Sequence, residues 1–246
     1  MRVLVACEFS GTVRRAFRAL GHDAWSCDLL EAEDADDRYC CHIKGDVLEI
    51  LEDGWDLMIA HPPCTRLTNS GVRWLKVPPR GKTLKEMWQE LDAACAFYRA
   101  LRDAPIPMKA IENPVMHCYA MKRLGNVKRQ VVQPHYFGDK AFKATGFELI
   151  GLPPLQRTHY MELPKRGTKE YKEWSAVHLA SPGPNRWKER SRTKPGIAAA
   201  MAAQWGLLAE SARHHLMKTL SGGPDTGGEP VVIGNRLRDA EDVTIW

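Results

Sequence analysis

A cysteine held on a stiff loop is the residue of this sequence that is best placed to do chemistry. Cys64 follows Pro62 and Pro63, which come directly after the apolar run 55–60. The run predicts a short buried strand and the prolines exclude a helix, so Cys64 should lie at the carboxyl end of that strand, where open α/β sheets bind ligands. A thiol in this position can act as a nucleophile if it ionises and is accessible. A buried structural cysteine is an equally good interpretation of this motif taken alone.

An acid and an amide end a second apolar strand, which is expected at 108–111. Glu112 and Asn113 stand there in front of Pro114. A soft nucleophile on one strand end and a carboxyl group on the next can act together as a nucleophile and an acid or base on one substrate. The pair makes a catalytic role the better interpretation of Cys64.

The N-terminal region has the layout of a cofactor site. A β-branched strand at 2–6 leads into the turn 9–11 and a helix at 13–20. This geometry lets backbone N–H groups approach a cofactor. A strand at 23–27 then ends in Asp28, and Asp46 follows a glycine further along the chain. Both acids are also ordinary capping residues for a helix or a turn.

Together these motifs resemble those of the cytosine-C5 DNA methyltransferases and occur in the family's order. Pro63-Cys64 is similar to the family's Pro-Cys motif, and Glu112-Asn113-Pro114 is similar to its Glu-Asn-Val motif. The chain also resembles the short methyltransferase-like proteins, often encoded by phages, that carry Pro-Pro-Cys-Thr and Glu-Asn-Pro. The resemblance implies that Cys64 adds to C6 of cytosine, that Glu112 binds or protonates the ring N3, and that Asn113 braces the loop.

The same resemblance implies S-adenosyl-L-methionine as the cofactor. In the family a Phe-Ala-Gly-x-Gly loop holds this molecule, an acid binds the ribose hydroxyls, and a Gly-Asp-Ile segment binds the adenine amino group. The matching cofactor residues of this chain are Phe9, Ser10, Gly11, Asp28, Asp46 and Pro63. Phe9 would pack on the adenine.

Substrate contacts are expected from loops outside the catalytic pair. Under the resemblance they would come from Thr65, Lys143, Thr145 and Arg192. Residues 133–138 and 143–145 stand in place of the family's Gln-x-Arg-x-Arg segment. Residues 191–197 are similar to its last motif without the asparagine and the serine. The loop 65–82 follows Cys64 directly and is placed to act as a lid.

The expected fold class is α/β, with a Rossmann-like, mostly parallel sheet flanked by helices, as in SAM-dependent methyltransferases. Hydrophobic spacing adds helices at 83–103 and 197–217 and a strand at 146–152. Residues 1–220 would form one methyltransferase-like catalytic domain, in which 155–190 is a small cap or substrate loop too short for a full target-recognition domain. Residues 221–246 are rich in glycine and proline and read as a flexible linker and C-terminal tail.

Composition favours a cytoplasmic protein. The 246 residues, 44% of them hydrophobic, suffice for one large core. No apolar run reaches the length of a membrane span, and the N-terminus lacks the layout of a signal peptide. Seven scattered cysteines favour a reducing compartment over a disulfide framework. No metal is expected, because the cluster Cys27, Cys40, Cys41 and His42 contains no Cys-x2-Cys pair.

The distribution of charge favours DNA as the partner. The formal net charge is +5, and basic residues gather at 122–129 and 186–194 with aromatic residues nearby. A solvated basic face is the ordinary alternative for either cluster. Three functions stay open: C5 methylation of cytosine in DNA, pyrimidine C5 chemistry on a free nucleotide, RNA or modified base, and a catalytically silent nucleic-acid-binding protein. A pure binder would have no need of both Cys64 and Glu112.

Overall fold

The computed structural model describes residues 1–34, 41–113, 115–125, 127–179, 183 and 186–220. Within these residues, seven strands form one sheet in the order β3-β2-β1-β4-β5-β7-β6. The strands are β1 (Arg2–Ala6), β2 (Asp23–Asp28), β3 (His42–Lys44), β4 (Leu57–Ala60), β5 (Met108–Glu112), β6 (Gln130–Val132) and β7 (Thr145–Ile150). Strands β3 to β5 are parallel, whereas β7 is antiparallel to both of its neighbours. The expected Rossmann-like, mostly parallel α/β fold is confirmed.

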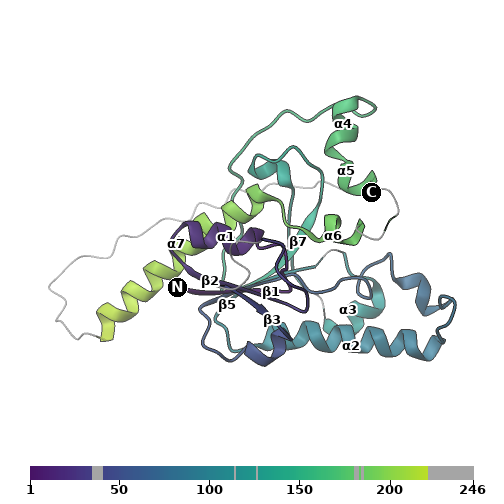
Figure 1. The fold of residues 1–246 in the computed structure, drawn as a ribbon, viewed down its shortest axis with the longest axis horizontal. Helices are drawn as coiled ribbons and strands as arrows, with labels where there is room; N and C mark the ends of the chain where they lie inside the picture. The colour runs from purple at the N-terminus through teal and green to yellow at the C-terminus, as the bar shows by residue number, and fades with distance from the viewer. Residues whose placement is uncertain (35–40, 114, 126, 180–182, 184–185, 221–246) are drawn as a thin grey trace, which may run out of the picture.

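Helices cover both faces of the sheet (Figure 1). One face carries α1 (Thr12–Ala19) and α7 (Pro195–Leu220), which contact each other. The other face carries α2 (Leu84–Asp103) and α3 (Cys118–Leu124). Strand β4 supplies both cores, because Leu57 and Ile59 pack with α1 and α7 while Met58 and Ala60 pack with α2. A central parallel strand is therefore buried along its whole length, as its unbroken apolar sequence predicts.

The strand order reverses between β1 and β4. From β1 the chain moves outward through β2 to β3, whereas β4 and β5 extend the sheet in the opposite direction. The connections on the two sides therefore diverge at the carboxyl ends of β1 and β4. This reversal of strand order is where doubly wound sheets bind their ligands. The loops that follow β1, β2, β4 and β5 all begin at this edge.

The predicted helices and strands are present with small shifts at their ends. Helix α2, for example, begins after Thr83, whose hydroxyl accepts a hydrogen bond from the backbone N–H of Glu86 while the Glu86 carboxylate accepts from the backbone N–H of Thr83. This reciprocal capping satisfies two N–H groups that would otherwise have no partner in the first turn. Strands β3 and β6 and helix α3 were not predicted from the sequence, and all three are short, with three to seven residues each.

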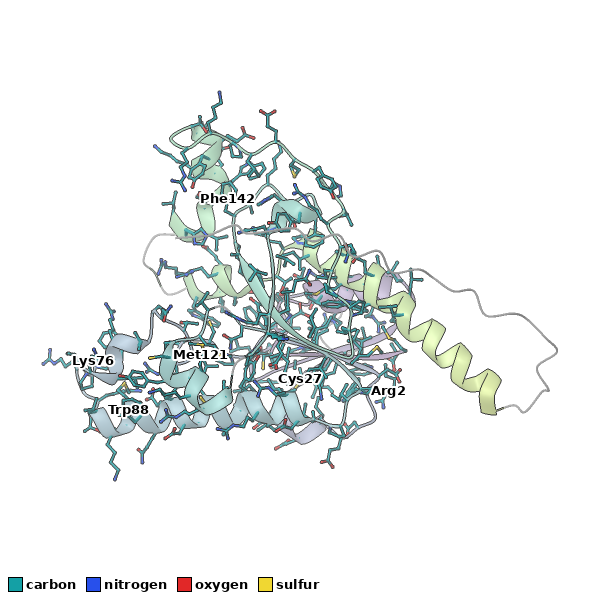
Figure 2. The ribbon with its side chains drawn as sticks, turned by 180° about the vertical axis from the view of Figure 1, so that it is seen from behind. Arg2, Cys27, Lys76, Trp88, Met121 and Phe142 are labelled. Carbon is teal, nitrogen blue, oxygen red and sulfur yellow. The ribbon has the colours of Figure 1, made fainter. Side chains whose placement is uncertain are left out.

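The segment expected as a cap contains three short helices. These are α4 (Lys169–Trp174), α5 (Ala176–Leu179) and α6 (Arg186–Ser191). Helices α4 and α5 stand away from the sheet, and α6 lies nearer to it (Figure 1). Phe142, labelled in Figure 2, joins α4 to the body, because its ring centroid lies 5.3 Å from those of both Tyr171 and Trp174. The division into a domain at 1–220 and a tail stays a prediction, and the tail 221–246 lies outside the described residues.

The described part of the chain contains no helix that is both long and apolar enough to cross a membrane.

Candidate active site

The register of β4 and β5 brings two polar side chains together at the carboxyl edge. Ala60 is paired with Ile111 in the ladder, so the residues that follow, His61 and Glu112, stand side by side. Their side chains meet with 2.6 Å between Nδ1 of His61 and Oε2 of Glu112. The two side chains are only 9% and 18% exposed, respectively. A buried carboxyl group therefore faces this edge with one of its oxygens already engaged.

Cys64 lies on the loop that leaves the same edge. Its carbonyl oxygen accepts hydrogen bonds from the backbone N–H groups of Leu67 and Thr68, at 3.0 and 3.1 Å, which curls the loop into a tight turn. The turn is closed by Gly71, where an added Cβ would lie 2.1 Å from the carbonyl oxygen of Thr65. Cys64 is half-buried, whereas Pro63 and Thr65 are exposed. The loop thus holds the thiol partly accessible in a fixed place.

Charge links Cys64 to Glu112 and to the segment before β7. Burial raises the pKa of the Cys64 thiol, and the carboxylate of Glu112 raises it further. The charges of Lys143 and Arg190 act in the opposite direction. These influences show that the structure brings Cys64, Glu112 and Lys143 into one site, although they are far apart in the sequence.

Glu112 is held in its ionised form. Burial alone would raise the pKa of its carboxyl group, but the hydrogen bond with His61 and the nearby charge of Lys143 outweigh burial, and the pKa lies below its ordinary value. Burial lowers the pKa of the Lys143 ammonium, and the charge of Glu112 opposes that effect. The two residues therefore stabilise each other's charged forms.

Backbone contacts fix the residues around this pair. Asn113 donates its backbone N–H to the carbonyl oxygen of Gly146 at 2.8 Å, which ties the end of β5 to β7. Thr145 is buried, and its hydroxyl donates to the carbonyl oxygen of Lys143 at 3.1 Å. Both amide atoms of the Asn113 side chain and Nε2 of His61 are buried with no hydrogen-bond partner among the described residues. Unpaired buried polar atoms of this kind are uncommon and point to a ligand or a water molecule.

The expected cofactor edge carries two carboxylates and a strained backbone. Cys7, directly after β1, has a φ of 58°, which is rare for a residue other than glycine and recurs at functional sites. Burial raises the pKa of the Cys7 thiol, and the charges of Asp28 and Asp46 add to the effect, so both carboxylates lie near this point. Asp28 also accepts from the N–H of Leu30 at 2.9 Å. Asp46 accepts from the N–H of Leu48 at 3.0 Å and caps a 3-10 helix, η1 (Val47–Ile50).

The backbone N–H groups at the start of α1 already have hydrogen-bond partners within the chain. The carboxylate of Glu8 accepts from the backbone N–H groups of Val13 and Arg14, at 2.7 and 3.2 Å. Ser10 is buried and donates to Glu8 at 3.3 Å. Gly11 has a φ of 67°, and a Cβ there would lie 2.4 Å from Oδ2 of Asp34. The helix N-terminus is therefore occupied by Glu8 and is not open to an anionic group of a ligand.

Residues 186–194, here called the strap, run across both parts of the site. The Trp187 ring lies 5.8 Å from the Phe9 ring. The Arg192 guanidinium makes two hydrogen bonds to the Glu33 carboxylate, at 2.8 and 2.9 Å. Lys143 donates from Nζ to the carbonyl oxygen of Arg192 at 2.9 Å. Phe9 and Arg192, which the resemblance assigns to the cofactor and the substrate, are thus both in contact with other parts of the chain.

The structure adds to the site three residues that were not predicted to belong to it. His61 precedes the proline pair, Cys7 follows the first strand directly, and Arg190 lies in the strap. The signal for His61 and Cys7 was their place at a strand end, where parallel sheets collect functional side chains. No local sequence signal relates Arg190 to Cys64, because that relation depends on how the strap crosses the sheet edge.

No protein-family model and no curated protein matches the sequence. Among solved structures, the chain is similar to a protein assigned as a DNA modification methyltransferase encoded within a prophage of E. coli, with a TM-score of 0.40 and 15% identity over 61% of this chain and 46% of that one. It is also similar to the Entamoeba histolytica methyltransferase EhMeth, with a TM-score of 0.45 and 14% identity over 67% of this chain and 57% of that one. The chain therefore spans about half the length of these structures. Both likenesses are distant, and the interpretation of the site comes from its own residues.

Proposed function

We propose that this protein transfers a methyl group from S-adenosyl-L-methionine to C5 of cytosine in DNA, with Cys64 as the nucleophile. The observation that carries the proposal is the placement of a half-buried thiol and a largely buried carboxyl group at the ends of neighbouring strands, where the charge of Lys143 acts on both. The strand order supports it, because this pair lies beside the point between β1 and β4 at which the strand order reverses.

Each group has a task in the proposed reaction. The Cys64 thiol gives its proton to the Glu112 carboxylate and Sγ forms a bond to C6, while the electron pair of the C5–C6 double bond moves through C4 towards N3 and Glu112 passes the proton on to N3. The proton that the thiol loses balances the proton that N3 gains. When bound, S-adenosyl-L-methionine supplies an electrophilic methyl group. Loss of the C5 proton to solvent then returns the electron pair to the ring, breaks the bond between Sγ and C6, and N3 gives back its proton.

The chemistry of the cofactor edge fits such a molecule in part. Ribose hydroxyls and an adenine amino group are donors, and Asp28 and Asp46 offer carboxylate acceptors near Cys7. Beside them, a Cβ added at Gly45 would meet no atom within 4 Å, so there is open space at this point. The turn at Ser10 and Gly11 fits less well, because Glu8 and Asp34 already fill it.

Substrates other than DNA define the second candidate. The pair of Cys64 and Glu112 would serve C5 chemistry on RNA, a free nucleotide or a modified base equally well, since only the pyrimidine ring meets these two groups. A nucleic acid is favoured over a free nucleotide by the basic residues of the strap, where Arg190 acts electrostatically on both Cys64 and Lys143. The third candidate, a catalytically silent binding protein, gives no role to the electrostatic coupling of Cys64, Glu112 and Lys143.

One labelling experiment separates these functions. The protein is incubated with tritiated S-adenosyl-L-methionine and, separately, with DNA, RNA and dCMP, and the labelled nucleoside is identified after digestion. We expect 5-methylcytosine from DNA. Label on RNA or dCMP alone would replace the first candidate by the second. Salt-dependent DNA binding without cofactor binding would replace both by the third.

The nucleophile is tested with DNA that contains 5-fluorocytosine. Fluorine at C5 cannot leave as a proton does, so the wild type should remain joined to the DNA under denaturing conditions. Cys64→Ser should lose both the adduct and methyl transfer while it binds the cofactor nearly as before. Cys118→Ser is the matched control, because Cys118 is an exposed free cysteine outside the site. An adduct that persists in Cys64→Ser would mean that another residue is the nucleophile.

A further inference from the structure

His61 is a largely buried histidine, with 9% of its side chain exposed, and its two ring nitrogens have different surroundings. Nδ1 lies 2.6 Å from Oε2 of Glu112, and Nε2 is buried without a hydrogen-bond partner among the described residues. When the Glu112 carboxylate is ionised it can only accept, so Nδ1 must carry the hydrogen and donate it. Neutral His61 is then fixed as the tautomer with Nδ1 protonated and Nε2 as an acceptor.

The contact also decides which part of Glu112 meets a substrate. The carboxyl group has two oxygens, and Oε2 is the one that His61 engages. Because His61 and Glu112 extend two strands in register, their relative placement is set by the β4 and β5 ladder and not by a mobile loop. The carboxyl group is therefore held in one orientation, with Oε1 as the oxygen left for another partner.

On the basis of the function proposed above, we infer that His61 is a positioning residue for Glu112 and presents Oε1 of that carboxyl group to the ring N3. In this scheme the proton at N3 is shared with Oε1 while the bond between Sγ and C6 exists, and it leaves N3 when that bond breaks. His61 neither gains nor loses a proton. It donates from Nδ1 throughout and so stabilises the carboxylate form of Glu112.

Several charged groups surround this pair and bear on its pH dependence. Lys143, in the segment before β7, lowers the pKa of Glu112 together with His61. Cys64, on the loop after β4, interacts with Glu112 and with Lys143. Arg190 and Lys194, on the strap, act on Lys143. Removal of the His61 donor alone should raise the pKa of Glu112 and move the limb of the pH–rate profile that reports Glu112 to higher pH.

The test compares two substitutions of His61 in the full-length protein. Asparagine places an N–H close to the position of Nδ1, whereas alanine removes the donor. We expect His61→Ala to lower kcat for methyl transfer at least about 10-fold, with little change in KM for the cofactor, and to move the Glu112 limb upward. His61→Asn should restore most of the rate and the position of the limb. His22→Ala is the control, because His22 is also buried but lies before β2, at the opposite edge of the sheet.

Each result supports or overturns the inference. A wild-type profile in His61→Ala, or equal losses in both His61 variants with an unmoved limb, would overturn it in favour of a packing role. Nitrogen-15 NMR of the histidine rings gives a readout that needs no activity: His61 should be protonated at Nδ1, and this preference should weaken in Glu112→Ala. If the wild type methylates no pyrimidine but shows this tautomer, the proposed function is wrong, while the hydrogen bond between His61 and Glu112 is confirmed. The other tautomer would overturn the inference.

Discussion

Opposing influences meet at the thiol of Cys64. Burial and the carboxylate of Glu112 raise its pKa, while Lys143 and Arg190 lower it. In the structure described here the thiol is therefore less ionised than a free cysteine would be at the same pH. When the ring N3 of a bound pyrimidine shares a proton with the Glu112 carboxylate, that carboxylate carries less negative charge. It then raises the pKa of the Cys64 thiol less. The nucleophile should accordingly become more reactive when a pyrimidine is in place, which protects it from side reactions at other times.

Removal of the Glu112 charge should separate the reactivity of the thiol from catalysis. In Glu112→Gln the carboxylate no longer raises the pKa of Cys64, so at a fixed pH near 8 a larger fraction of the thiol is ionised. We expect iodoacetamide to alkylate Cys64 faster in this variant than in the wild type, with the rate measured by mass spectrometry of the Cys64 peptide. Methyl transfer should fall at the same time, because the group that neutralises N3 is lost.

The peptide that contains Cys118 provides the internal standard for that measurement, because its exposed thiol lies outside the site. Equal alkylation rates of Cys64 in both proteins would show that the charge of Glu112 does not change the pKa of the Cys64 thiol. Slower alkylation in the variant would contradict the sign of the interaction.

At the scale of elements, the turn 64–71 depends on one glycine. The Gly71 backbone approaches Thr65 so closely that an added Cβ would lie 2.1 Å from its carbonyl oxygen. The obstacle is backbone, which cannot rotate away as a side chain can. Because the same turn fixes Cys64 through its carbonyl oxygen, its geometry is part of the catalytic arrangement.

Gly71→Ala should therefore disturb both stability and chemistry. We expect a loss of about 1–3 kcal/mol in the free energy of unfolding, as for other overpacked sites, and a lower yield of the 5-fluorocytosine adduct. Chemical denaturation and gel analysis of the adduct measure the two effects. Gly183→Ala is the matched control, since a Cβ there would meet no atom within 4 Å. A Gly71→Ala protein with unchanged stability and adduct yield would show that the turn adapts.

At the scale of the whole molecule, the sheet could be predicted from the sequence but the strap could not. The long apolar strands and the helices on either face follow from local hydrophobic patterns, which is why the positions of β1, β2, β4 and β5 are confirmed. A parallel sheet places Cys64 and Glu112 at the same edge, and the strand order makes their two strands neighbours. The pairing of His61 with Glu112 required the register, and the relation of Arg190 to Cys64 required the path of a distant segment, neither of which local sequence encodes.

The basic strap should contribute to binding of a polyanion. Arg190 acts on the site electrostatically and is not part of any ion pair described in the structure, so its charge is available to a phosphate. We expect Arg190→Glu to weaken binding of duplex DNA and to reduce the slope of log K against log salt concentration by about 1, measured by fluorescence anisotropy. Arg18→Glu on α1 makes the same charge change away from the strap and is the control. Equal effects of the two variants would indicate that net charge alone governs binding.

The contact between Trp187 and Phe9 has a consequence for the order in which two ligands are bound. A ligand that takes the place of Trp187 on Phe9 must displace the strap, which also reaches Lys143 through the carbonyl oxygen of Arg192. A ligand that engages Lys143 from the other side loosens the same segment. Whichever molecule binds first supplies the free energy that displaces the strap. The second molecule then binds more tightly, by a factor set by the equilibrium between the closed and displaced positions of the strap. By thermodynamic linkage, that factor is the same in either order of addition.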